Sequence, residues 1–278
     1  MIDIFITTYD REELFKRSLE SFDKNTNKDL YRLTVIYDGG CRPDIFDEVY
    51  DIADNVLFNN NNMGLGPSIN MALAHIDTLN KWYESSPDPA DKAKVSQFVC
   101  YCQDDLLYTE GWLEKLTQFF CMFEQQKKLG FASGVECIEH EEREELGTFG
   151  DFRLVTKDWI RATNVLGRRE YWMSLHPIPA FDPETGRKRA KPNDGMASGV
   201  DWWWIRNHEN SICKTGRTCL TIPGLLTHLG YNQSTWLKGG REMPESEDDK
   251  KAIRLDGLGE LIKEPEKLGL YDTEWTND

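Results

Sequence analysis

The sequence predicts an α/β fold, in which a mainly parallel central sheet is flanked by helices within a single domain of 278 residues. The first observation behind this prediction is that short apolar runs of strand length alternate with helical periodicity between residues 2 and 137. The second is that several of these runs end directly in Asp, Thr or Gly. Strands that alternate with helices of this length form a parallel sheet covered on both faces.

The first half contains five candidate strands and three candidate helices. The strands are residues 2–7, 33–37, 55–58, 97–102 and 130–137. The first helix carries Leu14 and Phe22 on one face, and the second is expected to have Pro67 at its first position. The third helix spans residues 111–128. Residues 81–97 are rich in Pro, Ser and charge, so we expect a surface insertion there.

The second half is less regular. Residues 139–145 are acidic and are expected to form a mobile loop, and residues 160–175 mix basic, aromatic and apolar side chains. A helix is predicted to begin near residues 199–204, and residues 218–226 form an apolar run that ends in polar residues. From about Gly239 the chain is charged and weakly periodic, which indicates a tail or a loosely packed helix.

Composition disfavours several classes of protein. Hydrophobic residues make up 39% of the chain and aromatic residues 12%, which is typical of a globular protein. The net charge of −15 repels phosphate backbones, so bulk nucleic acid is disfavoured as a partner. The basic cluster at residues 187–191 is interpreted as a solvated loop. No apolar run reaches the roughly 18–20 residues of a transmembrane helix, and we therefore expect a soluble, cytoplasmic enzyme.

The seven cysteines do not form a recognisable metal or disulfide pattern. Their number is odd and their spacing is irregular. Cys100 and Cys102 lie in an apolar run and would share one face of a strand. Reduced thiols in the core are the expected state.

Asp104 and Asp105 follow directly after the strand predicted at residues 97–102. Two adjacent carboxylates at the end of a buried strand are costly unless a cation pairs with them. A divalent ion that bridges the oxygens of a diphosphate meets that need; alternatively, one of the two simply caps the next segment. His228 lies at another strand end, where it either supplies an imidazole ligand to the same ion or is a satisfied core residue.

The segment around Asp201 carries a further candidate. Asp201 precedes three Trp, and it either caps a helix or acts as a general base toward an acceptor hydroxyl. Three consecutive Trp cannot share one helix face, so we expect at least one near the site and the others in the core. The candidates for the acceptor side are Trp202, Trp203 and Arg168.

A loop of Asn and Gly precedes the predicted second helix. It runs from Asn62 through Gly64 to Pro67. Glycine-rich loops at helix N-termini favour the approach of phosphate. The loop lacks the Gly-x-Gly-x-x-Gly spacing of a dinucleotide-binding motif, so by itself it is a weak signal.

Taken in order, these segments resemble the GT-A glycosyltransferases, in particular the large inverting family 2-like group. The similar segments are residues 4–11, 35–40, 60–70, 98–105, 199–202 and 227–228. The resemblance covers about residues 1–235 and is clearest over 1–137. It implies a Rossmann-like nucleotide-sugar binding half at 1–137, an acceptor-binding and catalytic half at 138–240, and an acidic C-terminal tail or helix at 241–278.

The resemblance also implies roles for single residues. The nucleotide-sugar pocket would be lined by Thr7, Tyr9, Arg11, Asn62 and Gly64, with Asp38 hydrogen-bonded to the base and Asp104 near the ribose. Asp105 and His228 would hold the metal, and Asp201 would be the catalytic base. Because the motif reads Gln-Asp-Asp rather than Asp-x-Asp, either carboxylate is open as the metal ligand.

The expected activity is that of a metal-dependent, hexosyltransferase-like glycosyltransferase. It would use Mn²⁺ or Mg²⁺ and a nucleotide-sugar donor, with a UDP-sugar favoured, and would act with inversion on an unidentified acceptor: a glycan, a protein, a small molecule or a modified base. One alternative is a nucleotidyltransferase acting on sugar phosphates, which the absence of a Gly-rich basic loop after the first strand disfavours. The other is a non-catalytic GT-A-like binding domain.

Overall fold

The computed structural model describes a defined part of the chain. The described residues are 1–9, 11–39, 46–127, 129–135, 142–157, 162–178, 200, 204, 217–222 and 224–229. Asp201, Trp202, Trp203 and the predicted tail at 241–278 lie outside the described residues.

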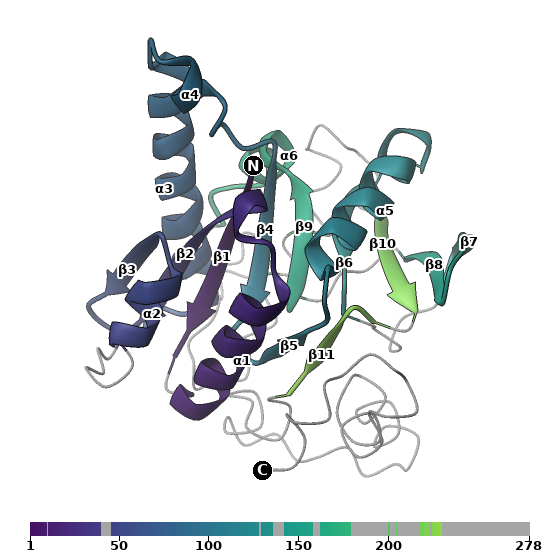
Figure 1. Cartoon of the computed structure of the whole chain (residues 1–278), viewed down its shortest axis with the longest axis horizontal. Helices are drawn as coiled ribbons and strands as arrows, with labels where there is room; N and C mark the ends of the chain where they lie inside the picture. Colours follow the sequence, from purple (N-terminus) through teal and green to yellow (C-terminus); the bar gives the residue numbers. More distant parts are fainter. Residues whose placement is uncertain are drawn as a thin grey trace, which may run out of the picture.

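A nine-stranded sheet forms the centre of the molecule, with its strands in the order β3-β2-β1-β4-β9-β6-β10-β8-β7 (Figure 1). The strands are β1 Ile2–Thr8, β2 Tyr31–Asp38, β3 Asn55–Asn59, β4 Phe98–Gln103, β6 Leu129–Ser133, β7 Glu144–Phe149, β8 Phe152–Lys157, β9 Asn164–Arg168 and β10 Arg217–Ile222. Neighbours among β3, β2, β1 and β4 are parallel, as are β6 and β10, whereas β9 is antiparallel to both β4 and β6. The predicted α/β fold with a mainly parallel central sheet is confirmed.

Helices cover both faces of this sheet (Figure 1). They are α1 Glu12–Asn25, α2 Phe46–Ile52, α3 Leu65–Ser85, α4 Pro89–Lys92, α5 Trp112–Lys127 and α6 Arg169–Ser174. The chain moves outward from β1 to β2 and β3, and then returns to β4 on the other side of β1. Because parallel crossovers are right-handed, this reversal places α1 and α3 on opposite faces.

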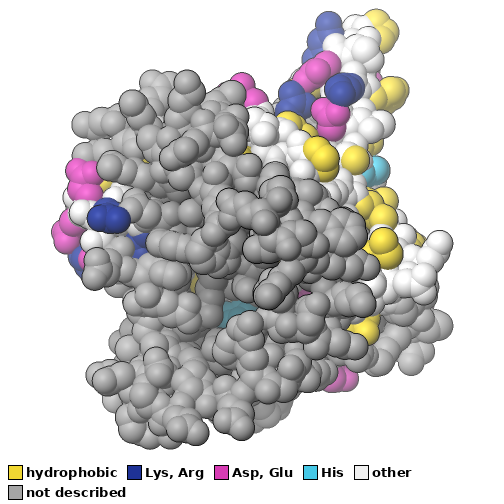
Figure 2. Space-filling view, turned by 180° about the vertical axis from the view of Figure 1, so that it is seen from behind, with side chains coloured by type: hydrophobic (Ala, Val, Ile, Leu, Met, Phe, Trp, Pro, Cys, Tyr) yellow, Lys and Arg dark blue, Asp and Glu magenta, His cyan; other side chains and the backbone are white. Residues whose placement is uncertain are grey.

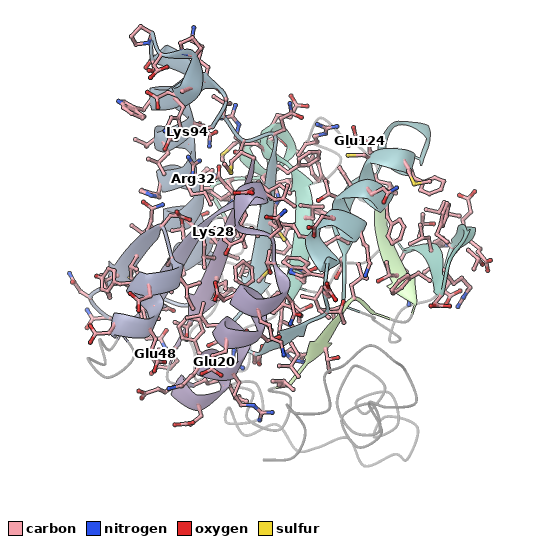
Figure 3. The ribbon with its side chains drawn as sticks, in the orientation of Figure 1. Glu20, Lys28, Arg32, Glu48, Lys94 and Glu124 are labelled. Carbon is pink, nitrogen blue, oxygen red and sulfur yellow. The ribbon has the colours of Figure 1, made fainter. Side chains whose placement is uncertain are left out.

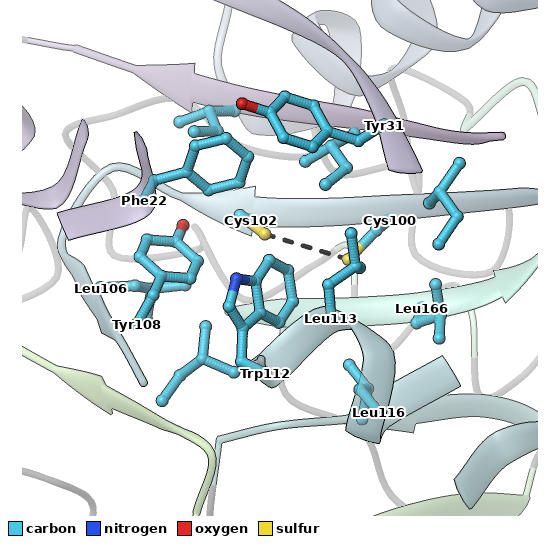
Figure 4. Packing of buried hydrophobic residues seen from close by; sticks show 14 of the residues in the cluster. Phe22, Tyr31, Cys100, Cys102, Leu106, Tyr108, Trp112, Leu113, Leu116 and Leu166 are labelled. Carbon is cyan, nitrogen blue, oxygen red and sulfur yellow. Dashed lines mark hydrogen bonds between the residues drawn. The ribbon is translucent and has the colours of Figure 1, made fainter. Parts of the chain in front are cut away.

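The first face is packed by α1, α2 and α5. Ile4 and Ile6 of β1 belong to the same buried cluster as Phe22 of α1 and Trp112 of α5, as Figure 4 shows for part of that cluster. The Sγ atoms of Cys100 and Cys102 lie in it, 3.9 Å apart and unbridged. The prediction that these two cysteines are buried, reduced thiols on one strand face is confirmed.

The second face is packed by α3 and α6. Its buried cluster joins Phe5 of β1 and Ile69 of α3 to Trp172 of α6. Trp204 is also fully buried there, with its ring centroid 5.1 Å from that of Trp172. One of the three consecutive Trp is therefore a core residue, as the sequence predicts.

Two predicted boundaries are wrong. Helix α3 begins at Leu65, so Pro67 is its third residue, and the helix continues to Ser85, into the first part of the segment expected to be an insertion. A proline is tolerated there because the N–H groups of the first turn have no partner within the helix. Figure 2 shows α3 and α4 standing out from the molecule, with side chains of both charges at the far end. Glu144, expected in a mobile loop, begins strand β7.

Two short strands, β5 Leu106–Tyr108 and β11 Leu226–His228, form a separate antiparallel pair. Their pairing joins a segment next to Asp105 to one more than a hundred residues later in the chain. Among the described helices, none combines the length and the apolar composition needed to cross a membrane.

Candidate functional site

The candidate site lies where the direction of the chain through the sheet reverses. Strands β1 and β4 are parallel neighbours, and the chain leaves β1 on one side and enters β4 from the other. Such a reversal opens a crevice beyond the carboxyl ends of the two strands, which is where open α/β sheets bind ligands. Thr8 ends β1 and Gln103 ends β4, so the residues that follow them meet at this crevice.

Arg11 bridges the two carboxylates that follow β4. It lies at the N-cap position of α1, and its Nη2 donates to Oδ1 of Asp104 while its Nη1 donates to Oδ2 of Asp105. Thr8 Oγ1 donates to the other oxygen of Asp104 at 2.8 Å. Both carboxylates are fully buried, whereas the Arg11 side chain is 15% exposed. The guanidinium therefore occupies the more solvent-accessible part of this cluster.

His228 reaches the same cluster through the β5–β11 pair. His228 is opposite Leu106, the residue after Asp105, in the antiparallel register. Its Nε2 lies 3.2 Å from Oδ1 of Asp105 and 3.2 Å from Oε1 of Gln103. The backbone N–H of Leu229 donates to the Asp105 carbonyl at 2.7 Å. The structure thus brings together Asp104, Asp105 and His228, three of the residues predicted for the site.

The two carboxyl groups differ in their electrostatics. Burial raises the pKa of Asp104, Arg11 acts against this and the Asp105 charge adds to it, so the net shift is upward. Burial acts in the same direction on Asp105, but His228 and Arg11 outweigh it and lower the pKa of Asp105. Burial of Arg11 is likewise outweighed by the two carboxylates, which raise its pKa. Asp105 is therefore the more firmly ionised of the pair.

One oxygen of Asp105 is left without a hydrogen bond. Its Oδ1 is buried and lies 3.2 Å from His228 Nε2 in an ion-pair contact, but among the described residues it accepts no hydrogen bond of standard geometry. Both oxygens of Asp104 are already bonded, to Arg11 and Thr8. An unsatisfied buried carboxylate oxygen is costly, so Oδ1 of Asp105 is the atom that a cation would stabilise most.

The positions of these donors fit a divalent ion. Adjacent ligands of an octahedral ion with bonds of about 2.1 Å lie about 3 Å apart, close to the 3.2 Å between Asp105 Oδ1 and His228 Nε2. Within the described part of the chain, no three His, Cys, Asp or Glu side chains are arranged to hold a metal. An ion at Asp105 and His228 would therefore need further oxygens from water or from a bound ligand.

Asp38, at the end of β2, holds the loop that precedes α3. Its Oδ1 accepts from the backbone N–H of Met63 at 2.8 Å and from Asn59 Nδ2 at 2.8 Å, and its Oδ2 accepts from the N–H of Gly64 at 2.7 Å. This carboxylate thereby caps the N-terminus of α3 from a neighbouring strand. The Gly64 N–H, expected to face a phosphate, is bonded to Asp38.

The next residue, Gly39, lets the loop approach closely. Its φ is +89°, and a Cβ at this position would lie 2.4 Å from the backbone nitrogen of Asn62. Only glycine fits such a contact at a positive φ. Asn62, predicted for the pocket, keeps a buried Oδ1 without a hydrogen-bond partner. The loop is therefore held firmly at the carboxyl end of β2.

Thr7 and Tyr9, which are both predicted for the pocket, lie at the carboxyl end of β1 and differ in their exposure to solvent. Thr7 is buried, with its Oγ1 3.1 Å from the hydroxyl of Tyr101, on the α3 side of the sheet. Tyr9, just beyond the strand, is 37% exposed. Tyr9 is thus the more accessible of the two.

Arg168, predicted for the acceptor side, lies at the opposite end of the sheet. It pairs in register with Phe98, the first residue of β4, and binds Glu124 of α5 with two hydrogen bonds of 2.9 and 2.6 Å. Figure 3 labels Glu124 near the top of the view, where the parallel strands begin. Because β9 runs antiparallel to β4, its last residue lies far from the carboxylates that follow Gln103.

Two residues that contact the cluster are absent from the sequence-based site. Thr8 bonds Asp104, and Gln103 faces His228. Both are the last residues of parallel strands. Strand-end position, rather than residue type, was the signal that could have identified them.

Comparison with known proteins finds only distant structural likeness. No protein-family model matches the sequence, and no curated protein matches it. A mannosyltransferase from Pyrobaculum calidifontis, solved with GDP-Man and Mn²⁺, is similar over 64% of this chain and 47% of its own, with a TM-score of 0.43 and 13% identity. S. aureus TarS 1–349 in complex with UDP is similar over 79% and 57%, with a TM-score of 0.46 and 13% identity.

This chain spans about half of the length of those two solved chains. The fold and the site themselves define an α/β protein with a carboxylate–imidazole cluster at a strand crevice.

Proposed function

We propose that this protein is a metal-dependent glycosyltransferase that moves a sugar from a nucleotide-sugar, a UDP-sugar in the first instance, to an acceptor hydroxyl with inversion. The observation that carries the proposal is the buried Asp105, whose free Oδ1 faces His228 at the crevice between β1 and β4. The order of the motifs in the sequence, which resembles that of the GT-A glycosyltransferases, supports the same activity.

Asp38 supports binding of the nucleotide base. Among the described residues, its Oδ2 accepts one hydrogen bond, from Gly64, and a carboxylate oxygen has room for a second. A base that presents an N–H, such as uracil, suits that acceptor. We place the ring of the exposed Tyr9 against the base or ribose, with Thr7 behind it.

Asp105 and His228 would hold Mn²⁺ or Mg²⁺ through Oδ1 and Nε2, with the diphosphate oxygens as further ligands. Such an ion supplies positive charge to the departing diphosphate. Arg11, which lies on the solvent side of the carboxylates, is placed to bind the same phosphates.

Asp201 is the proposed general base that takes the proton of the acceptor hydroxyl. The residue before it, Val200, is buried and packs against the position of Gly66 in the first turn of α3, with its Cγ2 3.9 Å from a Cβ built there. That turn is capped by Asp38 at the carboxyl end of β2. The buried Val200 thus brings the start of this segment next to the first turn of α3.

The decisive variant is Asp105→Asn. It keeps the shape of the side chain and removes the charged oxygen that faces His228. We expect Mn²⁺-dependent turnover of the preferred nucleotide-sugar to fall at least about 100-fold, because weakening even the surroundings of a metal ligand costs 10–100-fold. Donor hydrolysis is measured after calorimetry has ranked UDP, GDP, TDP and their sugars with and without Mn²⁺.

Two matched variants accompany it. Asp77→Asn changes an exposed acid whose ion pair with Lys81 lies on α3, and we expect wild-type turnover. Asp201→Ala is expected to lose turnover while it keeps Mn²⁺-dependent nucleotide binding. Folded wild-type protein that binds none of these nucleotides in the presence of Mn²⁺ would overturn the proposal and favour a non-catalytic binding domain.

A further inference from the structure

The charges around the proposed metal site are only partly balanced. Two fully buried carboxylates, Asp104 and Asp105, share one guanidinium, that of Arg11. Among the described side chains, the other ion-pair contact of this cluster is that of His228 with Asp105. The two carboxylates outnumber the one guanidinium that bridges them.

Arg11 is spread over both carboxylates rather than paired with one. Each of its terminal nitrogens donates to a different Asp. This arrangement occupies Oδ2 of Asp105 and Oδ1 of Asp104, while Thr8 occupies the remaining oxygen of Asp104. Among the described side chains, Oδ1 of Asp105 then remains for an incoming ion, together with Nε2 of His228 once it gives up its contact with Gln103 Oε1, and two ligands are few for Mn²⁺ or Mg²⁺.

The same guanidinium repels a free divalent ion and attracts a diphosphate. A cation that binds at Oδ1 of Asp105 comes within a few ångströms of Arg11, where like charges repel strongly in a buried setting. A diphosphate reverses the sign of that interaction, because its oxygens can bind both the ion and the guanidinium. Its oxygens also supply the ligands that the protein lacks.

We propose that Arg11 is an internal counter-cation that makes binding of the divalent ion depend on the diphosphate of the donor. In this proposal, which rests on the metal and nucleotide sites of the proposed function, the ion binds weakly alone and tightly together with the nucleotide. The 15% exposure of the Arg11 side chain, above carboxylates with no exposure, leaves it accessible to the phosphates.

The test measures the affinity of Mn²⁺ by calorimetry and by electron paramagnetic resonance, with Mn²⁺ alone and with UDP. In Arg11→Gln we expect Mn²⁺ alone to bind about tenfold more tightly, or more, because the repelling charge is gone. The enhancement of Mn²⁺ binding by UDP is expected to shrink by at least the same factor, because Mn²⁺ alone binds more tightly while the complex with UDP loses the contact of Arg11 with the phosphates.

Two further variants separate charge from geometry. Arg11→Lys keeps the positive charge but loses the planar guanidinium that bonds both carboxylates. The affinity of this variant for Mn²⁺ alone should therefore stay within about threefold of wild type. Lys16→Gln removes a cation from the same helix, where Lys16 pairs with the exposed Glu48 at 2.7 Å, and should change neither affinity. A purely structural role of Arg11 predicts instead that both Arg11 variants bind Mn²⁺ more weakly.

A charge-balanced variant keeps the test decisive if Arg11→Gln does not fold. In Arg11→Gln/Asp104→Asn, one positive and one negative charge are removed together. We expect near wild-type affinity for Mn²⁺ alone and a reduced enhancement by UDP. Full retention of that enhancement would overturn the inference.

The outcomes also separate this inference from the proposed function. Equal or weaker binding of Mn²⁺ alone by folded Arg11→Gln, with UDP-dependent binding intact, refutes the counter-cation and leaves the glycosyltransferase proposal standing. No Mn²⁺ binding by any of the proteins, with or without UDP, refutes both.

Discussion

Strands β1 and β4 carry buried carboxylates at both of their ends, and the two ends are built differently. At the amino end, Asp3 is 1% exposed, and its Oδ1 accepts from Arg32 Nε at 2.7 Å. Its Oδ2 accepts from Asn80 Nδ2 at 2.8 Å and from the hydroxyl of Ser96. At the carboxyl end, Asp105 is equally buried but keeps one oxygen without a hydrogen bond.

This difference distinguishes the structural role of Asp3 from the binding role that we propose for Asp105. Asp3 joins β1 to β2 through Arg32, to α3 through Asn80, and to the start of β4 through Ser96; Figure 3 labels Arg32 in this region. Both oxygens of that carboxylate are therefore hydrogen-bonded within the described structure. An ionised oxygen that is buried and unsatisfied, like that of Asp105, is instead tolerated where a ligand completes it.

The largest effect is expected at the amino end. Asp3→Asn removes the charge that neutralises the buried Arg32, so the free energy of unfolding should fall by about 3–5 kcal/mol. Urea denaturation measures it. Mn²⁺-dependent nucleotide binding by the folded fraction should not change, because the site lies at the other end of the strands.

The control for this variant is Asp77→Asn on the exposed face of α3. Its ion pair with Lys81 is solvent-exposed, and the expected cost is about 0.5 kcal/mol or less. If Asp3→Asn lowers the free energy of unfolding by no more than Asp77→Asn does, the structural role given to Asp3 is wrong.

His176 offers a second comparison, because this half-buried residue has a buried ring nitrogen, Nε2, without a hydrogen-bond partner among the described residues. Its Nδ1 lies 2.9 Å from Asn70 Oδ1, which also accepts from the Ile178 N–H. Nδ1 is therefore the protonated nitrogen. Burial lowers the pKa of His176 to about 3, so the ring stays neutral, and a neutral unpaired nitrogen costs less than an unpaired carboxylate oxygen.

This neutrality predicts a loss of stability in mild acid. Because the folded-state pKa lies below the unfolded value of about 6.5, the unfolded chain binds more protons between these values, and stability falls as the pH falls. By pH 5 the loss from this group is about 2 kcal/mol. Urea denaturation at pH 8 and pH 5 measures it, and His176→Asn should lose that part of the pH dependence. An unchanged slope in His176→Asn would show that the ring is not held neutral.

Apart from the Asp77→Asn control, the smallest effect is expected for Arg168→Gln. Its pair with Glu124 is partly exposed, at 33% and 13%, so we expect about 1 kcal/mol of destabilisation or less. Since Arg168 lies at the amino end of β4, nucleotide binding and turnover should stay at wild-type values. A large loss of acceptor turnover without a loss of stability would place Arg168 in the site after all.

The sequence predicts the first half of the fold well, because its strands are continuous apolar runs that end in polar residues. It also predicts the meeting of Asp105 and His228, since both follow strand ends. It does not decide between Asp104 and Asp105 as the metal ligand. That choice depends on which oxygens Arg11 and Thr8 occupy, and these contacts exist only once β1 and β4 are adjacent.

Arg168 shows why the second half is harder to predict. Local composition suggested a place near the acceptor, but the direction of β9 decides where its ends lie. An antiparallel strand between two parallel ones leaves no mark in local periodicity. The start of α3 was misplaced for a related reason: the carboxylate that caps it, Asp38, belongs to a strand more than twenty residues earlier.

The pairing of β5 with β11 has a consequence for how the protein is made. A ribosome adds about 5–20 residues per second, so the carboxylate of Asp105 is synthesised on the order of ten seconds before the imidazole of His228. Until β11 pairs with β5, the nascent chain has the acidic half of the cluster without its nitrogen ligand. The proposed capacity to hold a divalent ion at both residues would thus arise late in synthesis, after most of the central sheet has been made.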